Sequence, residues 1–477
     1  MEHMQVDVVI VGGGSAGVGA AYRLSRAENP PLRVAVIERN PGLGGVSVFG
    51  GVNCWEPGLG GQGVHEQLAG ALLGASGAAC VGRQTETPDS YIRWGMSRRC
   101  DAPYEATFWR ANLEAPRWRR LHFEPQAMAD AMAGLFAATP QICFLFETEL
   151  VDVQVQNGVI TAVQVMQADG QCLDISAKLF LDCSGDISLA RQAGCQARWG
   201  EEAQAVFHEP SAPEEVLPGQ VNGVSWIFRV SPRETELEEA LARQAAEVDV
   251  ESWLDAWVRS QRLLSQINEY PNGDLNVNML PTMEGSEFMA LERAEAAAIC
   301  RARIFRYWQW MQQEKGFSAY HISRIFPMPG IRESWRLAGV YTLLEQDVRA
   351  GLFAQPLARR VVALADHALD THGSTHIKGA RCPELVRPYG IPYDCMMPRE
   401  VENLLVACRG SSMSHIAASS ARLSRTMLAL GEAAGEAAVL CLECGISPTD
   451  MPVETLRCRL GIPAYEQCLA QRGYPAV

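Results

Sequence analysis

The chain has 477 residues, of which 48% are hydrophobic, so it can bury a large core, and its length suggests two or three domains. Its net charge of −14 argues against nucleic acid or an anionic membrane surface as a partner. No stretch approaches the ~20 uninterrupted apolar residues that a membrane span needs. The N-terminus also lacks the basic and apolar regions of a signal peptide.

Cysteine usage favours a cytoplasmic location. Fifteen cysteines without a secretory signal indicate reduced thiols rather than disulfides. Cys441 and Cys444 have CxxC spacing, but no second pair and no histidine cluster lie nearby in the sequence. We therefore expect packed thiols there and no metal site.

The first strand, turn and helix have the pattern of a dinucleotide-binding fingerprint. A buried-strand run is followed at once by a glycine turn and then by a helical pattern. Gly12 permits the tight turn, Gly14 lets the backbone approach a pyrophosphate, and Gly17 lets helix and strand pack closely. The helix that begins near Ser15 and Ala16 offers unpaired N–H groups and a positive dipole end to the phosphates.

The next strand indicates which dinucleotide binds. A second apolar run, 34–37, ends on Glu38, where a carboxylate would accept hydrogen bonds from ribose hydroxyls. Because this carboxylate would repel a 2′-phosphate, NADP is not expected. A second glycine turn follows directly, with Arg39, Gly44 and Gly45, and would bring backbone close to a longer ligand, which favours FAD over NAD. The alternative is an ordinary strand-to-helix loop.

Three further segments precede the middle of the chain. The loop 50–63 is too glycine-rich for a helix or strand and is expected to lie close to another part of the molecule. The segment 85–120 is rich in aromatic residues and arginine, which fits either a cover over a substrate or an ordinary surface subdomain. From Phe144 to Leu181 the pattern alternates as a β-meander, with hairpin turns at Asn157-Gly158 and Asp169-Gly170.

The changes of pattern divide the chain into three stretches. Residues 1–191 are assigned to a FAD-binding domain, and 192–380, with its prolines, tryptophans and long helical patterns, to an inserted substrate domain. From 381 to 477 the chain returns to a strand at 403–407, a turn, and a helix expected over 417–442. The predicted fold class is α/β: a Rossmann-like FAD-binding domain with a β-meander, plus an inserted α+β substrate domain.

Four sequence blocks resemble the FAD-dependent oxidoreductase family of the glutathione-reductase-type flavoprotein superfamily, a distant relative of the fumarate reductase flavoproteins. The blocks are GGGSAG at 12–17, FLDCSGDI at 180–187, PGIRESWRLAG at 329–339, and NLLVACRG at 403–410 together with LGEAAGEAA at 430–438. They span most of the chain. The first two are found across the superfamily, and the last two are more specific to this branch.

The resemblance implies a set of residues along the cofactor. Val151 would offer backbone to the adenine, Gly185 and Asp186 would close over the pyrophosphate side, and the turn near Arg409 with the helix after it would face the flavin ring. Where the family has a glycine this chain has Cys408, which puts a close backbone approach there in doubt. The implied cofactor-binding set is Gly12, Gly14, Ser15, Ala16, Gly17, Glu38, Arg39, Gly44, Gly45, Val151, Gly185, Asp186, Arg409 and Arg422.

Candidate catalytic residues follow from the chemistry of a flavin. His415 lies just before the helix expected to point at the flavin, and histidine suits a proton acceptor near neutral pH; its alternative role is structural, near the helix cap. Arg332 and Arg336, four apart on an expected helix, would clamp an anionic or polyhydroxyl substrate or stabilise reduced flavin. Salt bridges, for example to Glu333, are the alternative. In a reductive reaction, Arg332 or Arg409 would be the acid.

Candidate substrate residues are polar or aromatic. Asn276 and Asn278 stand at alternate positions of an expected strand and so share one face, which suits either sugar-like hydroxyls or plain exposure to solvent. Trp55, in the glycine-rich loop, is expected to line one side of the flavin.

The sequence therefore predicts a FAD enzyme that transfers a hydride from a small polar substrate, carbohydrate-like or polyol-like, to flavin N5. One alternative is a flavin-dependent reductase of an activated C=C bond. Another is a FAD-binding electron-transfer or assembly subunit that docks through 85–120. A single fingerprint argues against a pyridine-nucleotide disulfide reductase. The electron acceptor and a homo-oligomeric state are left open.

Overall fold

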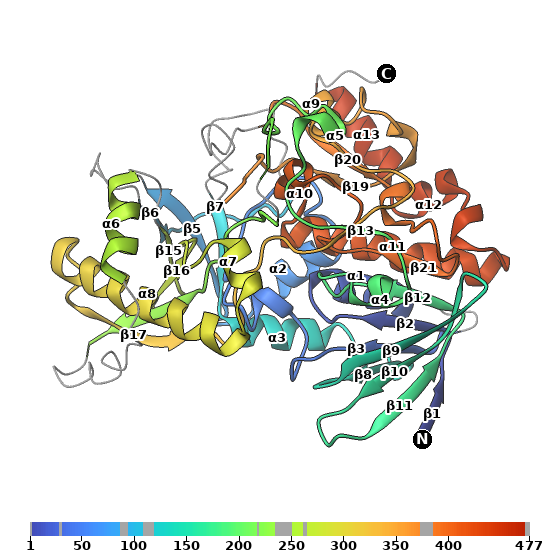
Figure 1. Cartoon of the computed structure of the whole chain (residues 1–477), viewed down its shortest axis with the longest axis horizontal. Helices are drawn as coiled ribbons and strands as arrows, with labels where there is room; N and C mark the ends of the chain where they lie inside the picture. Colours follow the sequence, from blue (N-terminus) through green and yellow to red (C-terminus); the bar gives the residue numbers. More distant parts are fainter. Residues whose placement is uncertain are drawn as a thin grey trace.

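The computed structural model describes residues 2–27, 31–85, 94–107, 119–216, 219–233, 250–260, 265–372 and 385–472. Two sheets dominate the described chain, with a group of helices formed by the C-terminal residues packed beside the first (Figure 1). Most of the predicted aromatic segment 85–120, and the predicted domain boundary at 380/381, lie outside the described residues.

A five-stranded parallel sheet carries the fingerprint. Its order is β21-β12-β2-β3-β8, and every strand pair is parallel. The strands are β2 (Val8–Val11), β3 (Val34–Ile37), β8 (Ile142–Leu145), β12 (Leu179–Asp182) and β21 (Leu404–Val406). All but β8 are buried at every position, as expected for short apolar strands in a sheet that is covered on both faces.

Two helices, α1 (Ser15–Ser25) and α11 (Ser424–Cys444), pack closely against each other beside this sheet. Small residues make this possible: a Cβ on Gly431 would lie 1.9 Å from the carbonyl oxygen of Ala16. The residues predicted to form the first strand and helix of the fingerprint therefore do so, and the last long helix stabilises them from the far end of the chain.

The β-meander is a separate sheet, shorter at both ends than predicted. It contains β9 (Glu149–Gln156), β10 (Val159–Met166) and β11 (Cys172–Ser176), and the N-terminal β1 (Glu2–Gln5) pairs with β11. Both predicted hairpin turns are present, with φ of 52° at Asn157 and 81° at Gly170. The prediction was wrong at its ends, since β8 and β12 belong to the parallel sheet, where each lies beside another apolar strand.

The second sheet has eight strands in the order β17-β14-β16-β15-β6-β5-β7-β4. Half come from the first part of the chain: β4 (Cys54–Trp55), β5 (Ala79–Thr85), β6 (Trp94–Arg99) and β7 (Arg119–Phe123). The others come from the predicted insert: β14 (Phe228–Pro232), β15 (Ser265–Glu269), β16 (Leu275–Asn278) and β17 (Tyr320–Ile325). A parallel pair between β6 and β15 joins the two halves.

The fold is thus α/β with an added α+β part, as predicted, but the second sheet is not built by the insert alone. The long helix α8 (Arg293–Glu314) lies beside this sheet with α6 (Val250–Ser260) and α7 (Gly285–Ala290) (Figure 1). Aromatic residues of α8, such as Trp308, pack on the sheet at Phe228 with ring centroids 5.8 Å apart.

Two predicted helices differ from the structure. The helix expected over 417–442 is two helices, α10 (His415–Ala421) and α11, because Leu423 adopts an extended conformation with ψ of 149°. The helix expected around Arg332 and Arg336 is absent: Arg336–Leu337 form β18, which pairs with β13 (Ala197–Arg198). This pairing holds the segment extended and gives the two arginines different surroundings.

The remaining described elements connect these layers. They are α2 (Val64–Gly74), α3 (Pro125–Gly134), α4 (Ser188–Gln192), α5 (Gln204–Phe207), α9 (Glu345–Ala350), β19 (Val361–Ala365), β20 (Tyr389–Pro392), α12 (Val453–Arg459) and α13 (Ile462–Gln471), with short 3-10 turns between some of them. None of the helices in the described ranges combines the length and apolar character needed to cross a membrane.

Candidate active site

The glycine turn after β2 has the shape of a ligand cradle. Gly12 has φ of +105°, which favours glycine, and a Cβ on Gly17 would lie 1.8 Å from the carbonyl oxygen of Gly12. A Cβ on Gly14, in contrast, would meet nothing within 4 Å. Gly12 therefore permits the tight turn, and Gly17 permits close packing of helix and turn. The backbone at Gly14 borders open space at the start of α1, where Ser15 and the following residues present helix N–H groups.

The second glycine turn packs directly on the first. The N–H of Gly44 donates to the carbonyl of Gly13 at 2.9 Å, and a Cβ on Gly45 would lie 3.1 Å from the Cα of Gly14. The carboxylate of Glu38, 5% exposed, accepts from the N–H of Gly13 at 2.6 Å and from the N–H of Asn40 at 2.8 Å. The structure thus brings together the two turns and the acid that were predicted to hold one dinucleotide.

Asp186 lies in the loop that follows β12, the strand next to β2 in the parallel sheet. Gly185 follows β12 with φ of +82°, and Asp186 accepts hydrogen bonds from Ser334 and from Arg409, each at 2.7 Å. Burial alone would raise the pKa of Asp186, but Arg409, the hydroxyl of Ser334 and the charge of Arg39 lower it below its usual value. Arg409 is therefore committed to an ion pair.

Val151 lies on β9 of the meander with 45% of its surface exposed. The chain enters β9 beside Glu38, because the N–H of Thr148 donates to the Glu38 carbonyl at 3.1 Å. The start of this strand is thus close to the predicted ribose site, and the adenine contact of Val151 stays a prediction.

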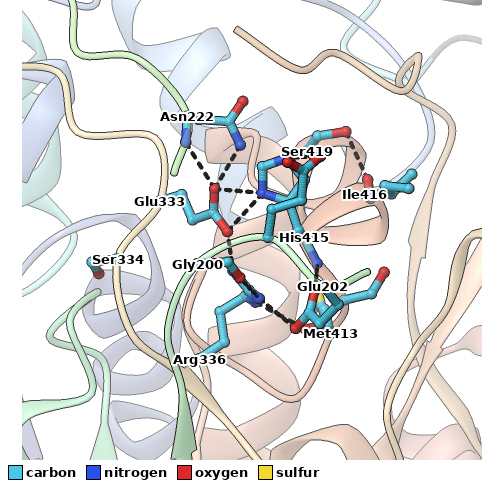
Figure 2. Close-up of polar contacts among 12 residues, drawn as sticks. Gly200, Glu202, Asn222, Glu333, Ser334, Arg336, Met413, His415, Ile416 and Ser419 are labelled. Carbon is cyan, nitrogen blue, oxygen red and sulfur yellow. Dashed lines mark hydrogen bonds and ion pairs between the residues drawn. The ribbon is translucent and has the colours of Figure 1, made fainter. Parts of the chain in front are cut away.

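His415 is enclosed in a polar network that we call the closed network. The closed network consists of Glu202, Asn222, Glu333, Arg336 and His415 (Figure 2). His415 Nδ1 donates to Glu333, with 2.8 Å to the nearer oxygen, and its backbone N–H donates to Glu202 at 2.9 Å. Burial, reinforced by the charge of Arg336, lowers the pKa of His415 to about 4.

Arg336 occupies the centre of this network. It pairs with Glu333 and, at 2.5 Å, with Glu202, and it donates to the carbonyls of Gly200 and Met413 (Figure 2). The side chains of Arg336 and His415 are each 1% exposed. For Arg336 the structure agrees with the salt-bridge alternative, and it does not bring this guanidinium to a position open to a ligand.

A second group of charged residues keeps part of its surface open, and we call it the open cluster. The open cluster consists of Glu56, Arg332, His367, Asp370, His372 and Arg422. Glu56 lies in the glycine-rich loop, Arg332 in the segment between β17 and β18, and Arg422 at the C-cap of α10. The other three residues follow β19. The open cluster therefore lies where segments that are far apart in the sequence meet.

Ion pairs run in a chain through the open cluster. His367 Nδ1 lies 3.3 Å from Glu56, and its Nε2 lies 3.8 Å from Asp370. The same Asp370 oxygen lies 2.7 Å from His372 Nε2 and 2.9 Å from Arg422 Nη2. Side-chain exposures are 24% for Glu56, 18% for Asp370, 17% for His372 and 14% for Arg422, so these groups remain reachable while being paired.

The two histidines of the open cluster are held in different charge states. Burial opposes protonation of His367, yet Asp370 and Glu56 raise its pKa above the usual value. Burial and the neighbouring charge of Arg332 lower the pKa of His372 to about 4. Protonation is therefore favoured at His367 and opposed at His372, with Asp370 between them.

Arg332 differs from the other arginines of the site. Its Nη1 donates to the carbonyl of Gly223 at 2.9 Å, and no carboxylate among the described residues lies within ion-pair distance of it. Burial and the like charge of Arg422 lower the pKa of Arg332 to about 9. A guanidinium in this position retains hydrogen-bond donors for a ligand.

Comparison with known proteins identifies the family of the chain. The family model described as "FAD dependent oxidoreductase" matches residues 7–460. The chain belongs to this family. Its cofactor is therefore FAD, and it is an oxidoreductase. The match includes the glycine turns, Asp186 and the open cluster within one family domain.

Curated relatives match over a much smaller part. Thiamine thiazole synthase 4, chloroplastic, from Physcomitrium patens is 49% identical over 49 residues, which are 10% of this chain and 14% of that protein. Thiamine thiazole synthase 1, chloroplastic, from Sorghum bicolor is also 49% identical over 49 residues, 13% of its length. The chain thus spans only about a seventh of the length of the curated relatives it matches.

Solved structures align over nearly the whole chain at low identity. A geranylgeranyl bacteriochlorophyll reductase-like protein from Thermoplasma acidophilum is 12% identical, with a TM-score of 0.49, over 97% of this chain and 84% of that one. A flavoprotein/dehydrogenase from Cytophaga hutchinsonii is 12% identical, with a TM-score of 0.45, over 98% of this chain and 85% of that one.

The residues present fit FAD. The open space beside Gly14 leaves room for a pyrophosphate, and Glu38 lies where a ribose is expected. Asn53, in the glycine-rich loop, is fully buried, and neither its amide nitrogen nor its amide oxygen has a hydrogen-bond partner in the described part of the chain. Because buried amides are normally paired, this side chain indicates a polar ligand beside the loop.

Two predicted substrate residues, Asn276 and Asn278, have hydrogen-bond partners within the fold. Asn276, fully buried, donates to the carbonyl of Gly51 at 2.8 Å and to the hydroxyl of Tyr270 at 3.0 Å, so it fastens the second sheet to the glycine-rich loop. Asn278 accepts from the N–H of Met279 at 2.6 Å. The solvent-exposed strand that was the alternative does not form here. The donor of Asn276 is used within the fold, while its amide oxygen has no partner among the described residues.

Trp55 is 3% exposed and packs against His65, with ring centroids 4.7 Å apart. Its indole N–H donates to Ser47 at 3.3 Å. The structure places its side chain in the hydrophobic core, and its contact with the flavin stays a prediction.

Sequence reasoning missed His367, Asp370 and His372. The signal was present: the apolar strand β19 is followed by Asp366-His367-Ala-Leu-Asp370-Thr-His372, a dense run of carboxylates and imidazoles at a strand end. It also missed Arg425, which is 2% exposed, pairs with Asp366 at 2.5 Å and donates to the carbonyl of Glu56. Arg425 thereby holds the glycine-rich loop against α11.

Proposed function

We propose that this flavoprotein oxidises a small polar substrate at the open cluster, with a hydride passing from a substrate C–H bond to N5 of FAD. The observation that carries this proposal is a partly open group of paired acids, imidazoles and arginines that includes Arg422. The family resemblance implies a flavin ring beside the turn near Arg409 and the helix after it, α10, and Arg422 is the C-cap residue of that helix. When bound, FAD would supply a hydride acceptor, and these residues would supply position and proton transfer.

His372 is the best-placed proton acceptor. Its Nε2 is fixed by Asp370 at 2.7 Å, and no hydrogen bond of its Nδ1 to the described residues is present. A carboxylate that fixes one ring nitrogen orients the other and stabilises the imidazolium that forms. The substrate would lose the hydride from carbon and the O–H or N–H proton to His372, leaving a carbonyl or imine product.

The sequence had favoured His415 for this role. His415 is 1% exposed, and its Nδ1 is bonded to Glu333. A buried imidazole in that position supports structure more directly than it supports proton transfer from a substrate, so we assign the base to His372.

Anaerobic reduction of the bound FAD tests this proposal. Sugars, polyols, amino acids and 2-hydroxy acids are added in turn while the visible spectrum is recorded, and one class should bleach the flavin band. His372→Ala should slow this reduction ~10²–10⁴-fold while FAD remains bound. His415→Ala is the matched variant. If it alone slows the reduction by that amount, the assignment of the base to His372 is wrong.

A specific observation also supports a reductive function. Of the two arginines considered as an acid, Arg409 is paired with Asp186, whereas Arg332 has no carboxylate partner among the described residues and has its pKa lowered to about 9. An arginine so placed would protonate a carbon while an activated C=C bond is reduced. Reoxidation of the dithionite-reduced protein by activated alkenes, with no class of donor able to reduce it, would favour this function over oxidation.

A further inference from the structure

We propose that the substrate bound at the open cluster is a small monocarboxylate, and that Arg332 binds its carboxylate. This inference rests on the proposed function for its site and names the chemical class of the substrate. It replaces a sugar or polyol with an acid as the ligand that the described residues fit.

The first argument is the unsatisfied cation. Arg332 uses one nitrogen to donate to Gly223 and has no carboxylate within ion-pair distance among the described residues. A guanidinium carries five N–H donors in a fixed planar fork, and this fork matches a carboxylate with two parallel hydrogen bonds. The bond to Gly223 fixes the orientation of the fork and so leaves it prepared for a ligand.

The second argument is the balance of charge around His372. Two guanidinium groups, Arg332 and Arg422, act on this imidazole together with one carboxylate, Asp370. Asp370 is already bonded to Arg422 at 2.9 Å. One positive charge is therefore left over, and a ligand with a single negative charge balances it better than a neutral polyol or a dianionic phosphate.

The third argument links the ligand to proton transfer. The charge of Arg332 is one cause of the lowered pKa of His372. A carboxylate bound to Arg332 would neutralise that charge, raise the proton affinity of His372, and so prepare the base only when the right ligand is present. A neutral ligand would leave His372 a poor base.

The fourth argument is the loss of the competing surface. The amide nitrogen of Asn276 donates to Gly51 and Tyr270, while its amide oxygen has no partner among the described residues, and the amide oxygen of Asn278 accepts from Met279. The donor of Asn276, which would have bound a hydroxyl group, is therefore used for holding the second sheet to the glycine-rich loop. Arg332, in contrast, has donors that none of the described residues uses.

Binding of unreactive ligands tests this without turnover. Acetate and propionate are titrated into the FAD-loaded protein, with acetamide and propionamide as neutral matches, and the shift of the flavin visible spectrum gives each Kd. The acids should bind and the amides should bind at least ~10-fold more weakly. Equal affinity of acid and amide would overturn the proposal.

Variants identify the residue. Arg332→Gln should raise the acetate Kd ~10–100-fold, as expected for loss of a hydrogen-bonded charge, and Arg332→Lys should fall between. Arg359→Gln, at an exposed arginine on a 3-10 turn, is the control and should leave the Kd unchanged. If Arg332→Gln retains acetate affinity but lowers the flavin midpoint potential, Arg332 serves the reduced flavin and the proposal is wrong.

The outcomes separate the two proposals. If acetate binds through Arg332 but no donor reduces the flavin, the oxidative function fails and the carboxylate site stands. If a neutral polyol reduces the flavin and acids do not bind, the carboxylate site fails and the oxidative function stands. Should Arg332→Gln purify without FAD, the acid and amide comparison on the unaltered protein decides.

Discussion

The closed network around His415 and the open cluster around His372 are built from the same residue types but differ in exposure. Side chains of the closed network are 1% exposed at His415 and Arg336 and 3% at Glu333, whereas those of the open cluster are 17% exposed at His372 and 18% at Asp370. Each network contains a histidine bonded to a carboxylate that also lies beside an arginine. The difference lies in how much of each group is left for a ligand.

This comparison shows what full burial demands of charged groups. In the closed network each carboxylate has several partners, as with Glu333, which accepts from Asn222, Arg336 and His415. Such complete pairing is the condition for burying charges without a large penalty. The open cluster is less completely paired, and Arg332 in particular retains donors. A network whose charged groups are all paired within the protein stabilises the fold, and one that keeps unused hydrogen-bond donors can bind a ligand.

The largest expected effect comes from breaking the closed network. Glu333→Ala removes the shared partner of Arg336 and His415 and should lower the free energy of unfolding by about 3–5 kcal/mol, because it leaves a buried guanidinium short of a counter-charge. Urea unfolding of the FAD-loaded protein measures this. Glu333→Gln, which keeps the shape and one acceptor, should cost less.

The matched change in the open cluster is Asp370→Asn. It should lower the free energy of unfolding less than Glu333→Ala does, since the partners of Asp370 can be hydrated. It should also slow flavin reduction, because His372 loses its orienting carboxylate. If Asp370→Asn destabilises the protein as much as Glu333→Ala does, the distinction between the two networks is wrong.

How far the sequence predicted these features depends on whether they are local. The turn from Gly12 to Gly17, the strand before it and Glu38 were predicted because strand period, glycine spacing and a terminal acid stand within forty residues. The open cluster was not predicted, because Glu56, Arg332 and Arg422 meet the run 367–372 only through the tertiary fold. Arg332 was singled out, but on a helix that does not form.

Long-range pairing also explains the errors in the fold. The strand β12 follows a meander in sequence, but its neighbours are β2 and β21 from the two ends of the chain. The second sheet likewise joins β6 to β15 across more than 160 residues. Neither pairing leaves a local periodicity that a single sequence displays.

A pH series sharpens the comparison at His415. The pKa of His415 is about 4 in the folded protein and about 6.5 when exposed, so between these values the unfolded state binds more protons. Stability should therefore be complete above pH 6.5 and fall as the pH is lowered toward 4. For this one group the loss between pH 7 and 5 is about 2 kcal/mol.

His415→Asn isolates this contribution, because asparagine does not titrate. The variant should lose less unfolding free energy than the unaltered protein when the pH is lowered from 7 to 5. Glu209, whose pKa burial raises to about 7, acts in the opposite direction but is present in both proteins. Identical losses in the two proteins would show that His415 does not stay neutral in the fold.

The glycine turn offers the same contrast between filled and open space. Gly17→Ala should destabilise the protein by about 1–3 kcal/mol, because its Cβ would lie 1.8 Å from the Gly12 carbonyl oxygen. Gly14→Ala meets nothing within 4 Å and should fold normally, but it should release FAD more readily. Unfolding midpoints of the apoproteins and fluorescence titration with FAD measure the two effects. Full FAD affinity in Gly14→Ala would place the pyrophosphate elsewhere.

The smallest expected effect concerns the residue that connects the two networks. Asn222 donates through its N–H and side-chain amide to Glu333, and its side-chain oxygen accepts from the N–H of His372 at 2.7 Å. The adjacent Gly223 accepts from Arg332 and donates to the carbonyl of His372 at 2.6 Å. The closed network thus holds the backbone of His372, the proposed base, and the carbonyl group to which the side chain of Arg332 donates.

Asn222→Ala should therefore slow flavin reduction about 10-fold, more through misplacement of His372 than through lost stability, which should fall by only about 1–2 kcal/mol. A purely structural role would leave the pH profile of the reduction rate unchanged. Positioning predicts a shifted profile, because the distance between Arg332 and His372 sets the proton affinity of the base. Asn222→Asp keeps the acceptor for the His372 N–H but places a negative charge against Glu333. Its reduction rate should therefore be closer to that of the unaltered protein at low pH than at high pH. Unaltered profiles in both variants would mean that the closed network and the open cluster act independently.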